Sequence, residues 1–300
     1  MQKQPKQSRR IDWGLVLRRI FTGDAPLLFT VTVFGVIFLI ITGISALFTK
    51  DPAADIDLSK VETGAIPVAS RALPTTDPDK PADPDIPSVP AETDPEPVTQ
   101  IMEVDERYFS DALFIGDSRT DGLRLYAPID GATYYCGTSM NIFKVMDSDY
   151  TAAGYKGIRN LLKNETYGKI YIMFGINEAG YDTDVFAAKF RTVVEEIRSY
   201  QPDAIIYIQS ILYVTQKHES SYPVFSSDNL KAKNAKLKEM ANGVDVFYLE
   251  VNDVLNDGTD HLPSDYTGDG VHLKANYYYL WRDYVMANAV VDPWHPWSPK

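Results

Sequence analysis

A serine, a histidine and an aspartate occur in settings where nucleophilic catalysis is chemically possible. Ser118 stands two residues after the apolar run 112–116, and Asp269 and His272 stand three residues apart near the C-terminus. A carboxylate bonded to one ring nitrogen of a histidine fixes its tautomer, so that the other nitrogen can take a proton from a serine hydroxyl. The three side chains therefore have the chemistry of an acyl-transfer site.

Each of these residues also has an ordinary structural interpretation. Asp117 or Ser118 would serve equally well as the N-cap of a helix, and a lone histidine such as His272 is more often a surface or core residue. Among the other histidines, His261 with its neighbour Asp260 is a weaker candidate for the same chemistry.

Two further residues could stabilise negative charge on a reacting oxygen. Gly137 follows the apolar run 132–136, and a glycine lets the backbone approach a ligand closely. Asn177 follows the run 169–175, and its amide could donate a hydrogen bond to an oxyanion. A turn glycine and an Asx turn are the alternative interpretations.

The elements that must position these residues alternate between strands and helices. Five apolar runs predict strands, and three segments with apolar residues at helical spacing predict helices between them. The predicted strands are 112–116, 132–136, 169–175, 204–210 and 244–250, and the predicted helices are 185–200, 228–242 and 274–289. The pattern predicts an α/β fold with a parallel sheet covered on both faces. Such sheets place their chemistry at the carboxyl ends of the strands.

The four sites follow the order of the four blocks of the SGNH, or GDSL-type, hydrolase family, which the chain resembles over residues 105–290. The blocks are matched by Gly116-Asp117-Ser118, by Gly137, by Gly175-Ile176-Asn177, and by Asp269 with His272. The resemblance implies a three-layer α/β/α fold with a five-stranded, mainly parallel, flavodoxin-like sheet.

The resemblance also implies roles for the individual residues. Ser118, His272 and Asp269 would form the catalytic triad. The backbone N–H groups of Ser118 and Gly137 and the amide of Asn177 would form the oxyanion hole, and no metal or organic cofactor would be needed.

Two positions depart from the family pattern. Arg119 replaces the leucine that gives the motif its name, and Glu178 replaces the aspartate that usually follows the asparagine. We interpret Asp117, Arg119 and Glu178 as possible substrate-binding residues, with Arg119 able to favour an anionic or sugar ligand.

The N-terminal part predicts a membrane anchor. Residues 25–49 carry no charge and are mostly apolar, a length sufficient to cross a bilayer as a helix. Residues 1–24 are basic, which by the positive-inside rule places them in the cytoplasm and the rest outside. Cleavage as a signal peptide is the alternative, although the apolar run is long for that.

Residues 50–100 predict a disordered linker. Residues 51–100 hold ten of the 19 prolines and eleven acidic residues, but no Phe, Tyr or Trp, so they cannot bury enough apolar surface to fold. The segment is either a spacer that lifts a domain from the membrane or a linker without a length requirement. Residues 101–300 then form one extracellular domain.

Composition excludes several other classes of protein. The net charge of −12 argues against a nucleic-acid binder, and a single cysteine, Cys136, excludes an intramolecular disulfide or a cysteine-built zinc site. Cys136 is expected to be buried as a small hydrophobe.

Together, the sequence predicts a membrane-anchored extracellular serine esterase that cleaves an ester, by preference O-acetyl, on cell-envelope carbohydrate. The same triad could instead serve an O-acetyltransferase whose acyl donor comes from a membrane partner. A non-catalytic envelope-binding module is the third alternative.

Overall fold

The computed structural model of the chain describes residues 53–54, 56–69, 99–292 and 295–297. The predicted basic segment 1–24 and the predicted membrane segment 25–49 lie outside these residues. Within the described ranges, no helix has the length and apolar character needed to cross a membrane.

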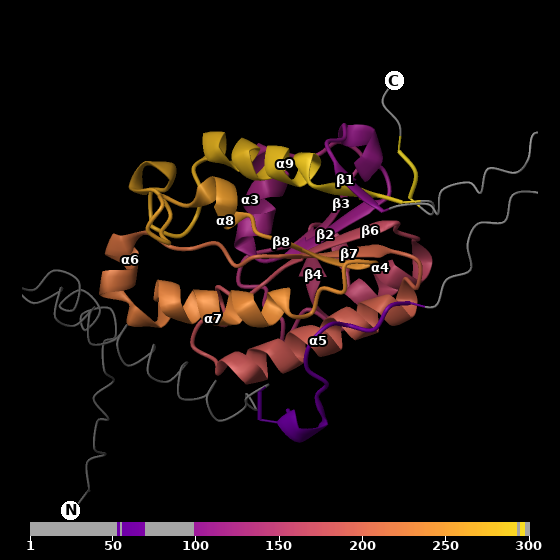
Figure 1. Cartoon of the computed structure of the whole chain (residues 1–300), viewed down its shortest axis with the longest axis horizontal. Helices are drawn as coiled ribbons and strands as arrows, with labels where there is room; N and C mark the ends of the chain where they lie inside the picture. The colour runs from indigo at the N-terminus through magenta and orange to yellow at the C-terminus, as the bar shows by residue number, and fades with distance from the viewer. Residues whose placement is uncertain (1–52, 55, 70–98, 293–294, 298–300) are drawn as a thin grey trace, which may run out of the picture. The chain divides into compact units, whose positions relative to one another are not determined.

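The centre of the fold is a sheet of five strands that pair in parallel throughout (Figure 1). The order across the sheet is β3-β2-β6-β7-β8, which is the flavodoxin-like order. Every residue of β2, β6 and β7 is buried, because helices cover both faces. The predicted α/β fold with a parallel five-stranded sheet is therefore confirmed. The strands are β2 (Ala112–Gly116), β3 (Thr133–Cys136), β6 (Lys169–Met173), β7 (Ile205–Gln209) and β8 (Val246–Leu249).

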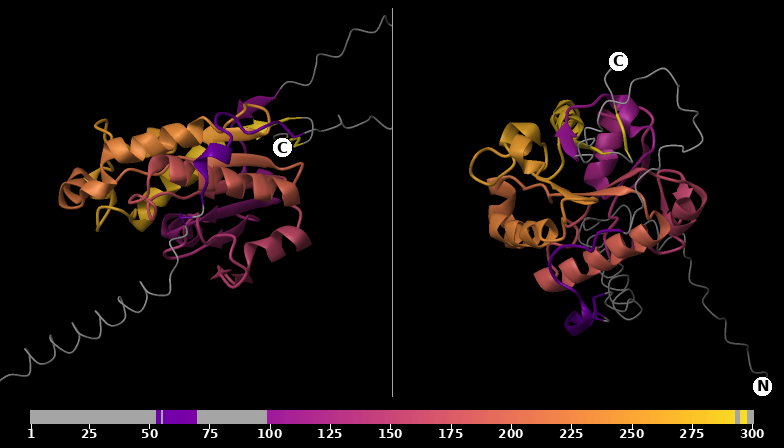
Figure 2. Two further views of the ribbon diagram at one scale, coloured as in Figure 1. Left: turned by 90° about the horizontal axis from the view of Figure 1, so that it is seen from below. Right: turned by 45° about the vertical axis from the view of Figure 1, so that its right-hand side comes forward.

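Helices cover the sheet from two sides, with α3, α8 and α9 on one face and α4, α5 and α7 on the other (Figures 1 and 2). A short helix, α6, lies beyond the sheet between β7 and α7. The helices are α3 (Ser118–Tyr126), α4 (Ile158–Asn164), α5 (Thr183–Tyr200), α6 (Gln216–Ser221), α7 (Ser227–Lys238), α8 (Asn252–Leu255) and α9 (Tyr278–Ala287).

Smaller elements complete the described part. An antiparallel pair, β1 (Gln100–Met102) with β9 (Ala289–Val291), joins the two ends of the domain. A second pair is β4 (Thr151–Ala152) with β5 (Tyr155–Lys156). The 3₁₀ turns are η1 (Leu58–Lys60), η2 (Glu106–Phe109), η3 (Pro223–Phe225), η4 (Ser264–Tyr266) and η5 (Ala275–Tyr277).

The core on the α9 side is built from aromatic rings. The ring of Tyr171 stacks between Phe114 and Tyr207, with centroids 4.5 and 4.3 Å away. Trp281 of α9 is fully buried and donates to the Gln209 side chain at 2.7 Å. The predicted helix 274–289 is in fact η5 followed by α9, and only part of its aromatic content is core, since Tyr279 is exposed.

Residues 56–69 form an ordered segment against α5 and α7, which we call the docked segment. Ile66 is only 3% exposed, and its N–H donates to the carbonyl of Met240 at 2.8 Å. The N–H of Ala69 donates to Asp245 at 2.8 Å. This differs from the predicted disordered linker over 50–100, because Ile66, which is buried, and Val61, which is partly buried, break the Pro/Asp pattern with apolar side chains.

Candidate active site

The turn from β2 into α3 presents Ser118 at a helix N-terminus. The Asp117 side chain caps the helix by accepting the Arg119 N–H at 2.8 Å. Gly116 is required for the turn, since a Cβ there would lie 2.1 Å from Thr120 Oγ1 and 2.8 Å from the Met173 carbonyl. Ser118 is partly exposed, so its hydroxyl is fixed in place by a buried strand yet open to a reactant.

The structure brings Ser118, His272 and Asp269 into one hydrogen-bonded chain. Ser118 Oγ lies 2.8 Å from His272 Nε2, and His272 Nδ1 lies 2.7 Å from Asp269 Oδ2. The serine and histidine are 154 residues apart in sequence. This arrangement has the geometry in which an imidazole can take the serine proton while a carboxylate holds its tautomer.

The loop before α9 holds the Asp269 carboxylate through several donors. Its Oδ1 accepts the N–H groups of Val271 and His272, both at 2.8 Å, and the Thr267 hydroxyl at 3.1 Å. Partial burial alone would raise the pKa of Asp269, but hydrogen bonds from His272 and Val271 outweigh it and lower that pKa below its ordinary value of 3.8. Asp269 is therefore held as a carboxylate beside the imidazole.

Gly137 and Asn177 follow β3 and β6 at the same edge of the sheet as Ser118. The register sets Gly116 beside Cys136 and beside Met173, so the three loops begin side by side. Asn177 is exposed, and its Nδ2 donates one hydrogen to the Met140 carbonyl at 2.8 Å. The Gly137 N–H donates to the Gly116 carbonyl at 3.3 Å. The predicted oxyanion role of these groups stays a prediction.

The three residues predicted to bind substrate are not placed where a substrate can touch them. Asp117 and Arg119 are each 1% exposed and Glu178 is 0% exposed. Arg119 instead donates to the Leu212 carbonyl at 2.6 Å, which ties α3 to the segment after β7. The burial has a physical reason: these side chains point from a turn or strand end into the packed layers of the fold.

Glu178 has a positioning role in this arrangement. Its Oε1 accepts the N–H of Ile142, so that Glu178 and Asn177 together hold the loop that follows Gly137. Burial raises the pKa of Glu178 to about 8. The side chain is therefore mostly protonated at neutral pH.

Sequence reasoning missed the residues that contact the loop carrying Asp269 from outside. The Thr215 N–H donates to the Gly270 carbonyl at 3.0 Å, and His218 Nδ1 lies 3.2 Å from the Asp269 carbonyl. No local pattern marks these contacts, because they join segments about 50 residues apart. Thr267 was identifiable in principle, since a threonine hydroxyl in a loop commonly accepts the N–H two or three residues later, as Thr267 does from Asp269 and Gly270.

Cys136 is buried, as the sequence predicted, with 1% exposure. Burial raises the pKa of its thiol to about 12. The thiol is therefore protonated at neutral pH and has no nucleophilic character. Among the described residues, no group of three or more His, Cys, Asp or Glu side chains could hold a metal ion.

Comparison with known proteins identifies the class to which this fold and site belong. Residues 114–280 match the family described as GDSL-like Lipase/Acylhydrolase. The chain therefore belongs to the GDSL-like lipase/acylhydrolase family, and the prediction of a GDSL-type hydrolase is confirmed.

Several solved structures are similar to the chain at low identity. A candidate platelet activating factor from Streptococcus pneumonia is 21% identical, with 60% of this chain and 87% of that chain covered and a TM-score of 0.48. A GDSL-like lipase from Bacteroides thetaiotaomicron is 14% identical, with 60% and 87% covered and a TM-score of 0.46. An acetyl xylan esterase from Geobacillus stearothermophilus is 15% identical, with 59% and 95% covered and a TM-score of 0.41. A search of curated proteins finds no match.

Proposed function

We propose that this chain is a serine esterase that uses Ser118, His272 and Asp269 to cleave an ester, by preference O-acetyl, on cell-envelope carbohydrate. The observation that carries the proposal is the hydrogen-bonded chain from Ser118 Oγ through His272 to Asp269. It lies at the carboxyl ends of parallel strands, in a chain of an acylhydrolase family.

The proposed reaction has two steps. His272 Nε2 accepts the Ser118 proton while Oγ bonds to the ester carbonyl carbon. The bond from that carbon to the leaving oxygen then breaks, and His272 returns the proton to the leaving oxygen. Water, activated by the same imidazole, releases the acyl group and restores the serine. Asp269 orients the ring and stabilises its charged form.

The developing oxyanion needs hydrogen-bond donors around the attacked carbonyl. The first N–H groups of a helix have no intrahelical acceptor, so the Ser118 N–H at the start of α3 is suited to this role. The second hydrogen of the Asn177 amide is another candidate. The Gly137 N–H is a third, and it would have to give up its 3.3 Å hydrogen bond to the Gly116 carbonyl to serve. Losing one such donor typically costs about 2.7–4 kcal/mol of transition-state stabilisation.

The proposal places the enzyme outside the cell, tethered by residues 25–49. The support is the uncharged 25-residue run between a basic and an acidic segment. Protease added to intact cells should digest the catalytic domain and leave a cytoplasmic tag on residues 1–24 intact. Digestion only after the cells are lysed would contradict this location.

The experiment that tests the activity is hydrolysis of 4-nitrophenyl acetate by the full chain in detergent. Ser118→Ala should lower kcat by about 10³-fold or more. Thr259→Ala is the matched control, because Thr259 is another hydroxyl that lies 3.1 Å from a carboxylate-paired histidine, His261. A Ser118→Ala variant with the wild-type rate would refute the proposal.

A further inference from the structure

A polar pocket of about 410 Å³ lies between α6 and the loop that carries Asp269. Its size is within the range of small-molecule sites. Asp269 lines the pocket and also binds His272, which in turn binds Ser118. The pocket thus adjoins the acid of the proposed triad, and the His272 ring connects that acid to Ser118. Its other walls include Thr215, Lys217, Ser221, Tyr222, Ser264 and Thr267.

Three polar groups of this lining are unengaged. Within the described part of the chain, the Lys217 ammonium and the hydroxyls of Tyr222 and Ser264 have no hydrogen-bond or ion-pair partner. All three residues are exposed. An ammonium, a phenol and an alcohol together offer both donors and acceptors, which is what the hydroxyl groups of a sugar require.

The lining also offers an aromatic surface. Tyr222 is 57% exposed, and its ring lies 5.0 Å from the His218 ring, centroid to centroid. An exposed aromatic face can cover the C–H face of a sugar ring while polar neighbours bind its edges. A fatty acyl chain, by contrast, would need a lining without unengaged polar groups.

The wall formed by α6 is fixed on its inner side. The Thr215 N–H donates to the Gly270 carbonyl, and His218 Nδ1 lies 3.2 Å from the Asp269 carbonyl. The approach is so close that a Cβ on Gly270 would lie 2.8 Å from the His218 Cβ. The position of α6 relative to the loop that carries Asp269 is therefore set by contacts to the backbone of that loop.

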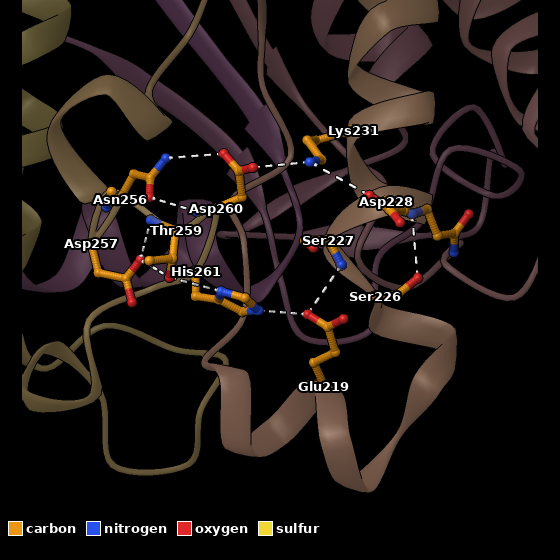
Figure 3. Close-up of polar contacts among 12 residues, drawn as sticks. Glu219, Ser226, Ser227, Asp228, Lys231, Asn256, Asp257, Thr259, Asp260 and His261 are labelled. Carbon is orange, nitrogen blue, oxygen red and sulfur yellow. Dashed lines mark hydrogen bonds and ion pairs between the residues drawn. The ribbon is translucent and has the colours of Figure 1, made fainter.

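The outer side of α6 is fixed by Glu219, as Figure 3 shows. Glu219 Oε2 lies 2.7 Å from His261 Nε2 and accepts the Ser227 N–H at 3.2 Å. The α6 wall of the pocket is thus held on both sides by contacts within the protein, so a ligand would not have to order it.

We propose that this pocket binds the sugar ring whose oxygen leaves when the ester is cleaved. The acyl carbon then stands at Ser118, while Lys217, Tyr222 and Ser264 bind the leaving sugar. This inference rests on the proposed function of Ser118, and it assigns substrate preference to α6 rather than to Arg119.

The test compares two acetyl esters with the full chain in detergent: a mono-O-acetylated methyl glucoside and 4-nitrophenyl acetate. The measured quantity is the ratio of their kcat/KM values. Tyr222→Ala should lower this ratio about tenfold, mainly through a higher KM for the sugar ester. Tyr279→Ala, which removes an exposed tyrosine outside the pocket, should leave the ratio unchanged.

The results of this test distinguish failure of the proposed sugar pocket from failure of the proposed esterase activity. An unchanged ratio in both Tyr222→Ala and Lys217→Ala, or an equal fall with Tyr279→Ala, would overturn the sugar pocket while leaving the esterase intact. Loss of Ser118-dependent turnover for both esters would instead overturn the proposed function. In that case, titration of the chain with the acetylated glucoside still tests the pocket, since Tyr222→Ala should weaken binding about tenfold and equal binding would refute it.

Discussion

Two histidines in this molecule contact a carboxylate at the same distance. His272 Nδ1 lies 2.7 Å from Asp269, and His261 Nε2 lies 2.7 Å from Glu219. Their surroundings differ, since the side chains of the first pair are 43% and 56% exposed and those of the second are 12% and 25% exposed. The first pair is open to a substrate, whereas the second lies between a helix and a loop.

The second ring nitrogen separates the two pairs more clearly. His272 meets the Ser118 hydroxyl, which follows a buried strand at the start of a helix. His261 meets the Thr259 hydroxyl at 3.1 Å, but that hydroxyl donates to Asp257 at 2.7 Å (Figure 3). A hydroxyl has one hydrogen, so Thr259 cannot also give it to His261. Of these two pairs, only His272 with Asp269 therefore has a neighbouring hydroxyl that can donate its hydrogen to the imidazole.

The largest difference between the two pairs is expected when each imidazole is removed in turn. His272→Ala should lower kcat for 4-nitrophenyl acetate by about 10³-fold or more, because the serine loses its base. His261→Ala should stay within about threefold of wild type. Equal losses in the two variants would mean that the comparison is wrong.

A second, smaller contrast comes from the two carboxylates. Asp269→Asn should lower kcat about 10³-fold, since an amide permits the wrong histidine tautomer. Glu219→Gln should leave kcat within about threefold. The measurement is single-turnover acetate release, and a nearly active Asp269→Asn variant would show that backbone contacts alone orient His272.

The pH dependence of kcat/KM should distinguish the His272–Asp269 pair from the His261–Glu219 pair in the folded enzyme. The lowered pKa of Asp269 keeps it ionised well below pH 5, so its stabilising contribution is present above 3.8 and lost only as pH falls through the lowered value. The acid limb of kcat/KM should therefore report protonation of His272, because imidazolium cannot accept a proton. His261→Ala should leave the midpoint of that limb unchanged, and a shifted midpoint would implicate His261 in turnover.

The smallest expected effect is on stability. Glu219→Gln replaces a charged partner of His261 and should lower the free energy of unfolding by about 1 kcal/mol. Urea unfolding of the full chain at pH 6 measures this, with Glu239→Gln, which changes the exposed glutamate that follows α7 as its C-cap, as the control. A loss no larger than the control's would show that the Glu219–His261 contact does not stabilise α6.

Local sequence predicted much of this fold because the strands are short, apolar and buried on both faces. The run 112–116 is the strand β2 to the residue, and the Ser118, Asn177 and His272 neighbourhoods were identified by their positions after strands or before a helix. Asp269 and His272 were also predictable as a pair, since three residues of loop suffice to join them.

Contacts between distant segments could not be predicted in this way. His261 was considered with its neighbour Asp260, yet Asp260 binds Lys231 and the histidine binds Glu219, 42 residues away. The burial of Arg119 and Glu178 was missed for a similar reason. A charged side chain is expected at the surface, and only the packed neighbours of the turn show that it is inside.

The docked segment extends the folded domain beyond the boundary that composition suggests. Ala69 is bonded to Asp245, and Gln100 is paired with Val291, so both of these described stretches belong to one folded body. Ile66 is only 3% exposed, and burial of such a side chain contributes about 1.5–3 kcal/mol. A domain that begins at residue 99 should therefore be less stable than one that begins at residue 56.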